Sequence, residues 1–545
     1  MNKVILSLIF FSFSLCLTAQ VEHLPITNPV YKFLEHLEIK GVLPHFSSSN
    51  LPLQKAEVIL FLKLANNNSK ELNANEVHTL ELYLKEFEII SRNNAVIIFS
   101  GTDFTQVLSN HFLSNDEKFV YHYKDSNNTV NLSPLGSFDA LLSKNNENIK
   151  LQNASIINFG IRLNGSISQH FGYYIQATNG MQLSGVKSLA LQDDKLSQNI
   201  KFADLNSDID FTESHLRIQY DLFYAIIGRE SRQIGSGISQ RIFNSTSAAP
   251  YDALSLGARF EGFEYRFTHG SLLSSSETSA LTSVAAVFPT KYIATHNFTL
   301  KPSWGEFGYW ESIIYSKRAA DLAYLNPLGF FKSLEHALHD RDNSLMGVYA
   351  TLRPFANFQL KASYLLDDII FDRIGTGYWS NKTAWNLAAQ YVLPISCNIG
   401  LEYSRVEPFT FSHFDTLNNY TNDSRLIGSD ILPNSDAITF ITQFWYGNRY
   451  PITLKISRIR HGDNITDSLG NVIKNVGANP MTLSGLEPLS KIIFLDGIRH
   501  DATRIQLEAG WEIIRGFNIQ AIYQIKYQDN TITNFFRCIF RFEDF

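Results

Sequence analysis

The sequence predicts an all-β transmembrane barrel of antiparallel strands, preceded by a small bundle of α-helices. Long segments alternate apolar and polar residues with a period of two, as strands do when one face is apolar. Aromatic residues reach 13% of the 545 residues, whereas charged residues make up only 18%. The one long apolar run lies at the N-terminus, which excludes a bundle of membrane-spanning helices.

The N-terminus has the form of a secretory signal peptide. Residues 4–17 are apolar, Lys3 precedes them, and the small residue Ala19 follows them. We expect cleavage after Ala19, so residues 1–19 are assigned to the signal. A transmembrane anchor is one alternative, although the run is short for it. A lipoprotein signal at Cys16 is another, which Leu15 disfavours because a small residue is needed there.

Composition and charge restrict the classes of partner. The net charge of −6 gives no reason to expect nucleic acid. Only Cys397 and Cys538 remain after the signal, and one distant pair does not make a disulfide framework. Both cysteines fit outward strand positions, where they would act as small apolar residues.

Residues 20–100 have a helical rhythm. Pro29 fits the first position of an amphipathic helix that ends at Gly41. Two further helices are expected over residues 52–65 and 74–91. Three short helices bury little surface on their own, so we expect them to dock on the larger unit as a periplasmic plug. An independent partner-binding domain is the alternative.

The segment 346–366 shows the design that the rest of the chain repeats. Apolar residues alternate up to Leu352, residues 354–357 supply a turn, and the alternation resumes at Phe358. Each arm has about 9–11 residues, the length of a tilted strand that crosses a bilayer. The segment therefore predicts a hairpin with one apolar and one polar face.

The same alternation recurs from Glu117 onward, and residues 101–545 are assigned to the barrel. A soluble sandwich also alternates, but its strands are usually shorter. Here the strands are long, end in aromatic residues and are joined by tight turns and long loops in alternation, as in outer-membrane barrels. Counting hairpins gives about 16 to 18 strands. The long loops include residues 179–214, 230–253, 409–435 and 461–500.

The inward-facing positions of the predicted barrel carry both signs of charge. They include Arg162, Arg217, Glu402, Arg504 and Glu508. Such an interior can line a polar channel or fill itself with ion pairs, and the sequence leaves both possibilities open.

The search for catalytic motifs is negative. The sequence has no Gly-x-Ser-x-Gly elbow, no phosphate-binding glycine loop and no His-Glu-x-x-His. His336 and His339 lie beside two acidic residues and offer half of a metal site, but surface histidines are the simpler interpretation. Asp367-Asp368 are paired carboxylates or a solvated strand end. We therefore expect no enzyme, no cofactor and no metal.

The loops and strand ends carry short motifs in a characteristic order. They are Gly228-Arg229, Gly235-Ser236-Gly237, Ala248-Ala249-Pro250-Tyr251-Asp252-Ala253-Leu254, Asp321-Leu322-Ala323-Tyr324-Leu325-Asn326-Pro327-Leu328-Gly329-Phe330-Phe331, Glu402-Tyr403-Ser404-Arg405-Val406-Glu407-Pro408-Phe409, Pro433-Asn434-Ser435-Asp436 and Arg460-His461-Gly462. From about Asn28 to its end, the chain resembles the Wzi family of capsule-assembly proteins. It departs from the family pattern at Ile234, Ser236 and Asn422, positions that bear on ligand specificity.

The resemblance implies a non-enzymatic outer-membrane barrel of about 18 strands with a helical plug on the periplasmic side. It also implies a lectin-like protein that helps to assemble or retain capsular or extracellular polysaccharide on a Gram-negative-type bacterium. Outer-membrane lipid and polysaccharide export machinery are the further partners expected. The rival functions are a channel for oligosaccharides or other small polar solutes, and an outer-membrane hydrolase.

The residues expected to bind polysaccharide combine aromatic rings with planar polar groups. Rings suit the apolar faces of sugars, and amide, carboxylate and guanidinium groups suit their hydroxyls. Each of these residues also has a structural alternative; Asn326-Pro327, for example, is a good turn former. The candidates are Tyr324, Asn326, Asp342, Asn343, Tyr403 and Arg405.

Overall fold

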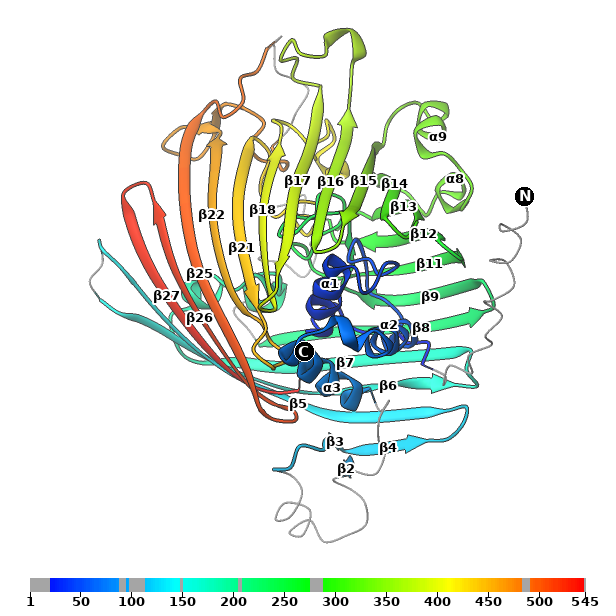
Figure 1. The fold of residues 1–545 in the computed structure, drawn as a ribbon. Helices are drawn as coiled ribbons and strands as arrows, with labels where there is room; N and C mark the ends of the chain where they lie inside the picture. The colour runs from blue at the N-terminus through cyan, green and yellow to red at the C-terminus, as the bar shows by residue number, and fades with distance from the viewer. Residues whose placement is uncertain are drawn as a thin grey trace.

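The computed structural model is a closed β-barrel with helices at one of its openings (Figure 1). It describes residues 20–87, 95–97, 113–147, 150–203, 208–274, 288–482 and 491–543. The predicted signal peptide, the end of the third predicted helix and Phe545 lie outside these residues. Among the described residues, no helix is both long and apolar enough to cross a membrane.

Eighteen long antiparallel strands form the barrel, which confirms the predicted fold class. β27 pairs with β5 from Phe542–Gly136 to Thr533–Asn145, and this pairing closes the barrel. The short strand β4 (Tyr121–Lys124) pairs only with the beginning of β5. The eighteen are β5 (Thr129–Asn145), β6 (Gln152–Ile167), β7 (Phe171–Gly185), β8 (Ile209–Tyr220), β9 (Phe223–Glu230), β11 (Tyr251–Phe260), β12 (Phe263–Leu272), β13 (Lys291–Leu300), β14 (Gly305–Ser316), β15 (Asn343–Phe355), β16 (Phe358–Asp368), β17 (Lys382–Leu393), β18 (Cys397–Val406), β21 (Ser435–Phe444), β22 (Ile452–Asp463), β25 (Ile498–Ile514), β26 (Phe517–Gln528) and β27 (Thr531–Phe542).

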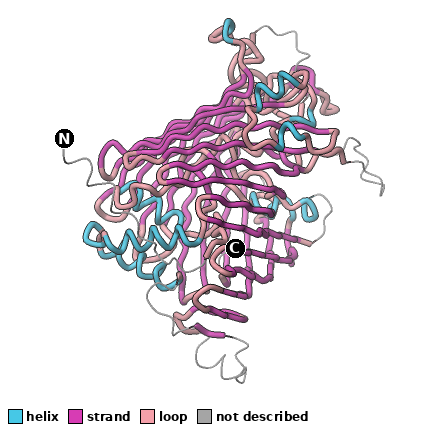
Figure 2. Tube along the Cα trace, turned by 90° about the vertical axis from the view of Figure 1, so that its right-hand side faces the viewer, coloured by secondary structure: helices cyan, strands magenta, loops and turns pink. Residues whose placement is uncertain are grey.

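The two ends of the barrel differ. Helices α1–α3 lie at one end, which we call the plug end, and the strands are joined there by tight turns (Figure 2). Most connections at the opposite end, the loop end, are long. They include residues 186–208, 231–250, 317–342, 369–381, 407–434 and 464–497. The strands reach further into the predicted loops than the sequence indicated, since β7 continues to Gly185 and β8 begins at Ile209.

The outer face of the wall is apolar. Phe159, Ile161 and Leu387 are more than half exposed there, in the outward register that the alternation predicts. Cys397 and Cys538 lie in the same register, and both are free. The hairpin of β15 and β16 forms as predicted, although its turn is shorter than expected and includes Asn357, whose φ of +65° is in the left-handed region.

Three helices form the plug. They are α1 (Val30–Lys40), α2 (Lys55–Asn67) and α3 (Ala74–Glu86). Pro29 precedes α1 and Gly41, at a φ of +86°, ends it, as the sequence predicted. The helices share a buried apolar core that also takes in Trp445 from the turn between β21 and β22. The plug therefore packs on the barrel wall.

Ion pairs join the plug to the inner face of the wall. Lys361 of β16 binds Glu35, and Arg353 of β15 binds Glu38. At the turn before β22, Arg449 binds Glu86. Since buried charges are stable only when they are paired, these contacts explain much of the inward-facing charge. The chain thus fills part of its mixed-charge interior with its own side chains.

Loops enter the interior from the opposite end. In the loop between β9 and β11, Phe243 is fully buried and its ring centroid lies 5.0 Å from that of Trp310 on β14. The backbone N–H groups of Ile238 and Ser239 each donate to Glu402, at 2.8 Å. The inner face of the β15–β16 hairpin is consequently not uniformly polar, because Tyr349 packs on Phe243. This explains the Gly235-Ser236-Gly237 motif as part of a segment that fills the barrel.

Two further loops add to this closure. Tyr420, from the loop between β18 and β21, is fully buried and its hydroxyl donates to the carbonyl oxygen of Phe243 at 2.6 Å. The loop between β7 and β8 carries α5 (Lys187–Ala190), α6 (Asp194–Ser197) and α7 (Ile200–Ala203). These helices pack on inward residues of β5, β6 and β8. Protein therefore occupies the interior from both ends.

The alternation of the wall can be tested in a bilayer. Leu387→Arg places a charge on the outer face in the middle of β17, where it is expected to cost about 2–4 kcal/mol. Gln520→Arg is expected to be tolerated, because Gln520 faces inward and donates to Glu508 at 2.7 Å. Equilibrium unfolding in lipid bilayers measures both. Equal stabilities would contradict the assigned register.

Because protein segments fill the barrel from both ends, removing the plug alone is not expected to open a pore. Removing residues 20–87 is expected to leave single-channel conductance in planar bilayers close to that of the full chain, because the loop-end segments still fill the interior. Removing them and also replacing residues 231–250 by a short turn is expected to raise it. The loop replacement alone is the control. An open pore after plug removal alone would show that the loops do not close the barrel.

Candidate functional site

A pocket of about 170 Å³ opens at the rim of the loop end. Three loops line it: residues 317–342 after β14, residues 369–381 after β16, and residues 407–434 after β18. The ends of β15, β16 and β17 complete the pocket. Segments far apart in the sequence therefore meet at this site, which we call the rim pocket.

Two aromatic rings line the rim pocket. Phe414 is 57% exposed, and its ring centroid lies 4.0 Å from that of His413. Trp379 is half-buried and is held edge to face against Phe409 at 5.8 Å, with the ammonium of Lys382 5.9 Å from its ring centroid. Accessible rings of this kind can pack against the apolar face of a ring-shaped ligand.

Polar groups surround these rings. Lys382 Nζ donates to the carbonyl oxygen of Ser412 at 3.0 Å, and Asp368 accepts from Ser380 Oγ at 2.7 Å. Asp340 also lines the pocket and is exposed. Since an ammonium has three donors and a carboxylate two acceptor oxygens, these groups can bond ligand hydroxyls in addition to their protein partners.

His413 lines the rim pocket as an uncharged ring. Burial, together with the positive charge of Lys382, lowers the pKa of His413 to about 4. Nδ1 of His413 lies 3.1 Å from the backbone nitrogen and 3.3 Å from the carbonyl oxygen of Asp415, so the backbone of Asp415 holds the ring in place. The site therefore contains an imidazole whose charge state does not change around neutral pH.

Asp342 and Asn343, two of the predicted residues, line the rim pocket. Arg318 holds Asp342 with two hydrogen bonds, at 2.8 and 2.6 Å, and the hydroxyl of Tyr324 donates to it at 2.8 Å. Asn343 donates to the carbonyl oxygen of Asn418 at 2.9 Å. Tyr324 itself is fully buried. It supports the site from below, and only Asp342 and Asn343 reach the pocket.

The remaining predicted residues lie elsewhere. Asn326 is exposed, and its side chain accepts from the backbone N–H of Leu328 at 3.1 Å, as a turn residue does. Tyr403 and Arg405 are on the outer face of β18, in the register of Leu401. The hydroxyl of Tyr403 donates to Asp436 at 2.9 Å. The structure therefore divides the six candidates between the rim pocket, a turn and the outer wall.

Tyr324 is buried because its loop folds against the outside of the barrel. Helices α8 (Leu322–Leu325) and α9 (Phe331–Ala337) lie beside β13–β15 (Figure 1). Phe331 packs on outward residues of β12–β14, with its ring centroid 4.2 Å from that of His296. His296 in turn pairs with Glu311 at 3.0 Å. The loop thus covers a buried ion pair that would otherwise face outward.

Sequence reasoning did not assign Trp379 and Phe414 to the site. Trp379 lies in a loop without a recognised motif, and Phe414 follows a motif residue without belonging to one. Only the folding of three separate loops onto one rim brings them beside Asp342. An aromatic residue in a long polar loop is a possible sign of a binding site. The many aromatic residues on the outer wall made this sign hard to distinguish in the sequence.

Among the residues that the structure describes, two groups of side chains have the spacing of metal ligands. Glu335, His336 and Asp340 lie on the rim, but Glu335 is engaged by Lys332 at 2.8 Å and Ser344 at 2.5 Å. His339 is not part of this group. The second group is His23, His215 and Glu230, at the inner wall. There Arg217 lies 2.9 Å from His23, and a nearby guanidinium disfavours a cation.

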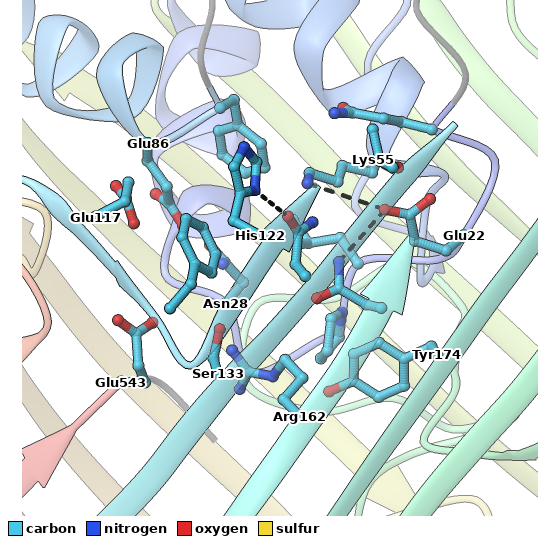
Figure 3. A pocket seen from close by; sticks show the side chains of 18 of the residues that line it. Glu22, Asn28, Lys55, Glu86, Glu117, His122, Ser133, Arg162, Tyr174 and Glu543 are labelled. Atoms are coloured by element: carbon cyan, nitrogen blue, oxygen red, sulfur yellow. Dashed lines mark hydrogen bonds and ion pairs between the residues drawn. The ribbon is translucent and has the colours of Figure 1, made fainter. Parts of the chain in front are cut away.

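Two other pockets lie at opposite ends of the barrel. A pocket of about 100 Å³ at the plug end separates the N-terminal segment from the wall (Figure 3). Glu22 and Lys55 face Arg162 and Tyr174 across it, so it is a polar gap between the plug and the wall. A pocket of about 520 Å³ at the loop end is lined by Arg425, Asp430 and residues of three other loops. It has no aromatic lining, unlike the rim pocket.

Comparison with solved structures identifies the type of barrel. Wzi of Escherichia coli, an outer-membrane protein involved in group 1 capsule assembly and described as a carbohydrate-binding β-barrel, aligns with a TM-score of 0.55 and 10% identity, over 95% of this chain and 98% of Wzi. The chain has the fold of the Wzi barrel. The predicted resemblance is confirmed at the level of the fold.

Two channel structures align less well. OccAB4 of Acinetobacter baumannii has a TM-score of 0.42, with 9% identity, over 75% of this chain and 97% of OccAB4. OprD of Pseudomonas aeruginosa has a TM-score of 0.41, with 11% identity, over 75% of this chain and 94% of OprD. No protein-family model matches the sequence, and the comparison with curated proteins finds no match.

The support of the rim pocket by Tyr324 can be tested. Tyr324→Ala is expected to lower the free energy of local unfolding of residues 317–342 by about 3–5 kcal/mol, because it removes a fully buried ring. Limited proteolysis of this loop measures the effect. Leu328→Ala is the control, since Leu328 is 86% exposed. Equal cleavage rates of the two variants would contradict the structural role.

Proposed function

We propose that this protein is a non-enzymatic outer-membrane barrel that binds capsular or extracellular polysaccharide at its loop end. In this proposal the residues up to 19 are a secretory signal, residues 20–100 form the periplasmic plug and the rest is the barrel. Short turns face the periplasm and long loops face outward in barrels of this class. The rim pocket would then open at the cell surface.

The observation that carries the proposal is the chemistry of the rim pocket. Trp379 and Phe414 provide ring faces, and Asp368, Lys382 and Asn343 provide groups that bond hydroxyls. This pairing of flat apolar and planar polar groups suits a sugar residue. Support also comes from the Wzi barrel, which is described as carbohydrate-binding.

Retention of a polymer fits a small pocket of this kind. One hydrogen bond contributes only about 0.5–1.5 kcal/mol net, so a single sugar unit would bind weakly. A polysaccharide repeats the same unit, and many barrels share one membrane. Linked sites raise the overall avidity by roughly 10²–10⁴ without stronger single contacts. Firm retention of polymer is therefore compatible with weak binding of short fragments.

A channel for oligosaccharides or other small solutes is the alternative function. The segments that fill the interior from both ends argue against it. Phe243, Trp310 and Tyr420 are all fully buried inside the barrel. A solute would have to displace this apolar core as well as the ion-paired plug, so passage needs a large rearrangement.

The proposal predicts a specific loss of polymer binding. Trp379→Ala combined with Phe414→Ala is expected to release polysaccharide into the medium, because the pocket loses both ring faces. Surface-bound and released polysaccharide are measured on cells, and the amount of barrel in the membrane is measured in parallel. Purified protein is expected to bind polymer more firmly than a short oligosaccharide.

The matched control is Phe371→Ala. Phe371 is 77% exposed and lies in the same loop as Trp379, but it does not line the rim pocket. It is expected to leave retention unchanged. Normal retention by a correctly folded double variant would refute the assignment of the pocket. Equal loss in the control would assign the effect to the loop as a whole.

A further inference from the structure

The rim pocket has more negative than positive side chains. Its lining includes five carboxylates but only two lysine ammonium groups, and the imidazole of His413 is uncharged. The carboxylates belong to Glu335, Asp340, Asp342, Asp367 and Asp368, and the ammonium groups to Lys332 and Lys382. Like charges in one pocket repel each other, so a positively charged ligand group would relieve this repulsion.

Two of the five carboxylates are neutralised by basic side chains. Arg318 donates two hydrogen bonds to Asp342, at 2.8 and 2.6 Å, and Nζ of Lys332 lies 2.8 Å from Glu335. The other basic partners in this loop bind carboxylates that do not line the pocket: Lys317 pairs with Asp415 at 3.4 Å, and Arg341 with Asp321 at 3.9 Å. Three lining carboxylates therefore remain.

The remaining carboxylates are those of Asp340, Asp367 and Asp368, and they are weakly compensated. The side chain of Asp340 is 66% exposed, and the nearest nitrogens of Lys332 and His336 are 3.9 and 3.8 Å away from it. Asp368 is exposed, and it forms no ion pair with any residue that the structure describes. The excess of negative charge is therefore open to a ligand.

Asp367 shows where a ligand group would bind. The residue is only 7% exposed, yet it lines the pocket. Its Oδ2 accepts from the backbone N–H of Phe411 at 2.5 Å, whereas its Oδ1 has no hydrogen-bond partner in the described part of the chain. Nζ of Lys382 donates to the carbonyl oxygen of Ser412 at 3.0 Å and forms no ion pair with Asp367. Polar groups of buried side chains normally have a partner, so a ligand can supply the missing donor.

The spacing of these carboxylates does not suit a metal ion. Among the described residues of the rim, only Glu335, His336 and Asp340 form a group of three with ligand atoms within 4.8 Å of one another. Asp367 and Asp368 are not part of that group, whereas Ca²⁺ needs about 6–8 oxygens around one point. An ammonium group attached to a larger molecule fits better, because it binds both to carboxylates and to the faces of aromatic rings.

We propose that the rim pocket binds an amino sugar whose amino group is protonated, with the ammonium beside Asp367 and Asp368 and the sugar ring against Trp379 or Phe414. This inference rests on the proposed function, because it names the kind of sugar that the same pocket takes from the polysaccharide. N-acetylation removes the positive charge of the ligand, and a sugar carboxylate adds a negative one. Both changes are expected to weaken binding.

The test measures saccharide binding to the purified full-length protein in detergent by isothermal titration calorimetry. The probes are a glucosamine tetrasaccharide, the same tetrasaccharide fully N-acetylated, and a glucuronate-containing tetrasaccharide. At about pH 6 amino groups are protonated and exposed carboxylates are ionised. The glucosamine form is expected to bind about tenfold more tightly than the acetylated form, and the glucuronate form more weakly than both. Salt at about 1 M is expected to remove most of the preference.

A charge variant and a matched control locate the effect. Asp340→Asn combined with Asp368→Asn keeps the size of both side chains and removes two exposed charges. It is expected to abolish most of the preference for the glucosamine form and to leave binding of the acetylated form unchanged. Asp372→Asn is the control, because Asp372 is exposed in the same loop as Trp379 but does not line the pocket. It is expected to bind like the parent.

The outcomes separate this inference from the proposed function. Equal affinity for the glucosamine and acetylated forms, with both weakened by Trp379→Ala and Phe414→Ala, would overturn the charge preference and retain the sugar site. Failure of every saccharide, polymer included, to bind would overturn both. Binding that requires added Ca²⁺, or a preference for the glucuronate form, would overturn the amino-sugar assignment. Equal effects of the double Asn variant and Asp372→Asn would assign the preference to the general charge of the rim and would also overturn it.

Discussion

The structure depends on one constraint: a strand in a bilayer has no water to satisfy its backbone N–H and C=O groups. The antiparallel pairing of β27 with β5 meets this constraint by leaving the barrel without an open edge. Closure then fixes the register of the wall, since every second residue must point inward. With eighteen strands the enclosed space is large, and it has to be filled by protein or water.

The chain fills that space with its own segments. Glu35 and Glu38 of the plug pair with basic residues of the inner wall, and Glu86 pairs with Arg449 in the turn before β22. Removing either partner would leave a buried charge, which is more costly than the pair is stabilising. Nearer the loop end, an apolar core around Phe243 and Trp310 fills the interior. The plug and the wall therefore depend on each other, so the plug is not an independently folding domain in the usual sense.

The sequence predicted the features that follow from local periodicity. The alternation of strands, the helix between Pro29 and Gly41, and the outward cysteines all agree with the structure. Contacts between loops were not predictable, because no periodicity connects segments 30 or more residues apart. For this reason the sequence did not predict that Tyr324 is buried beneath the rim pocket, or that Trp379 lines it. The family resemblance supplied the barrel type but not the positions of individual side chains.

Two long loops fold in opposite directions, one onto the outer wall and one into the interior. Residues 317–342 leave the barrel axis and pack on the outer wall through Phe331, whereas residues 231–250 fold inward through Phe243. The rim pocket is consequently displaced from the axis, beside the wall. A long chain held there would lie across the rim and not point into the interior. The filled barrel acts as a rigid support for the rim. Loops from distant strands can therefore come together there and form one site.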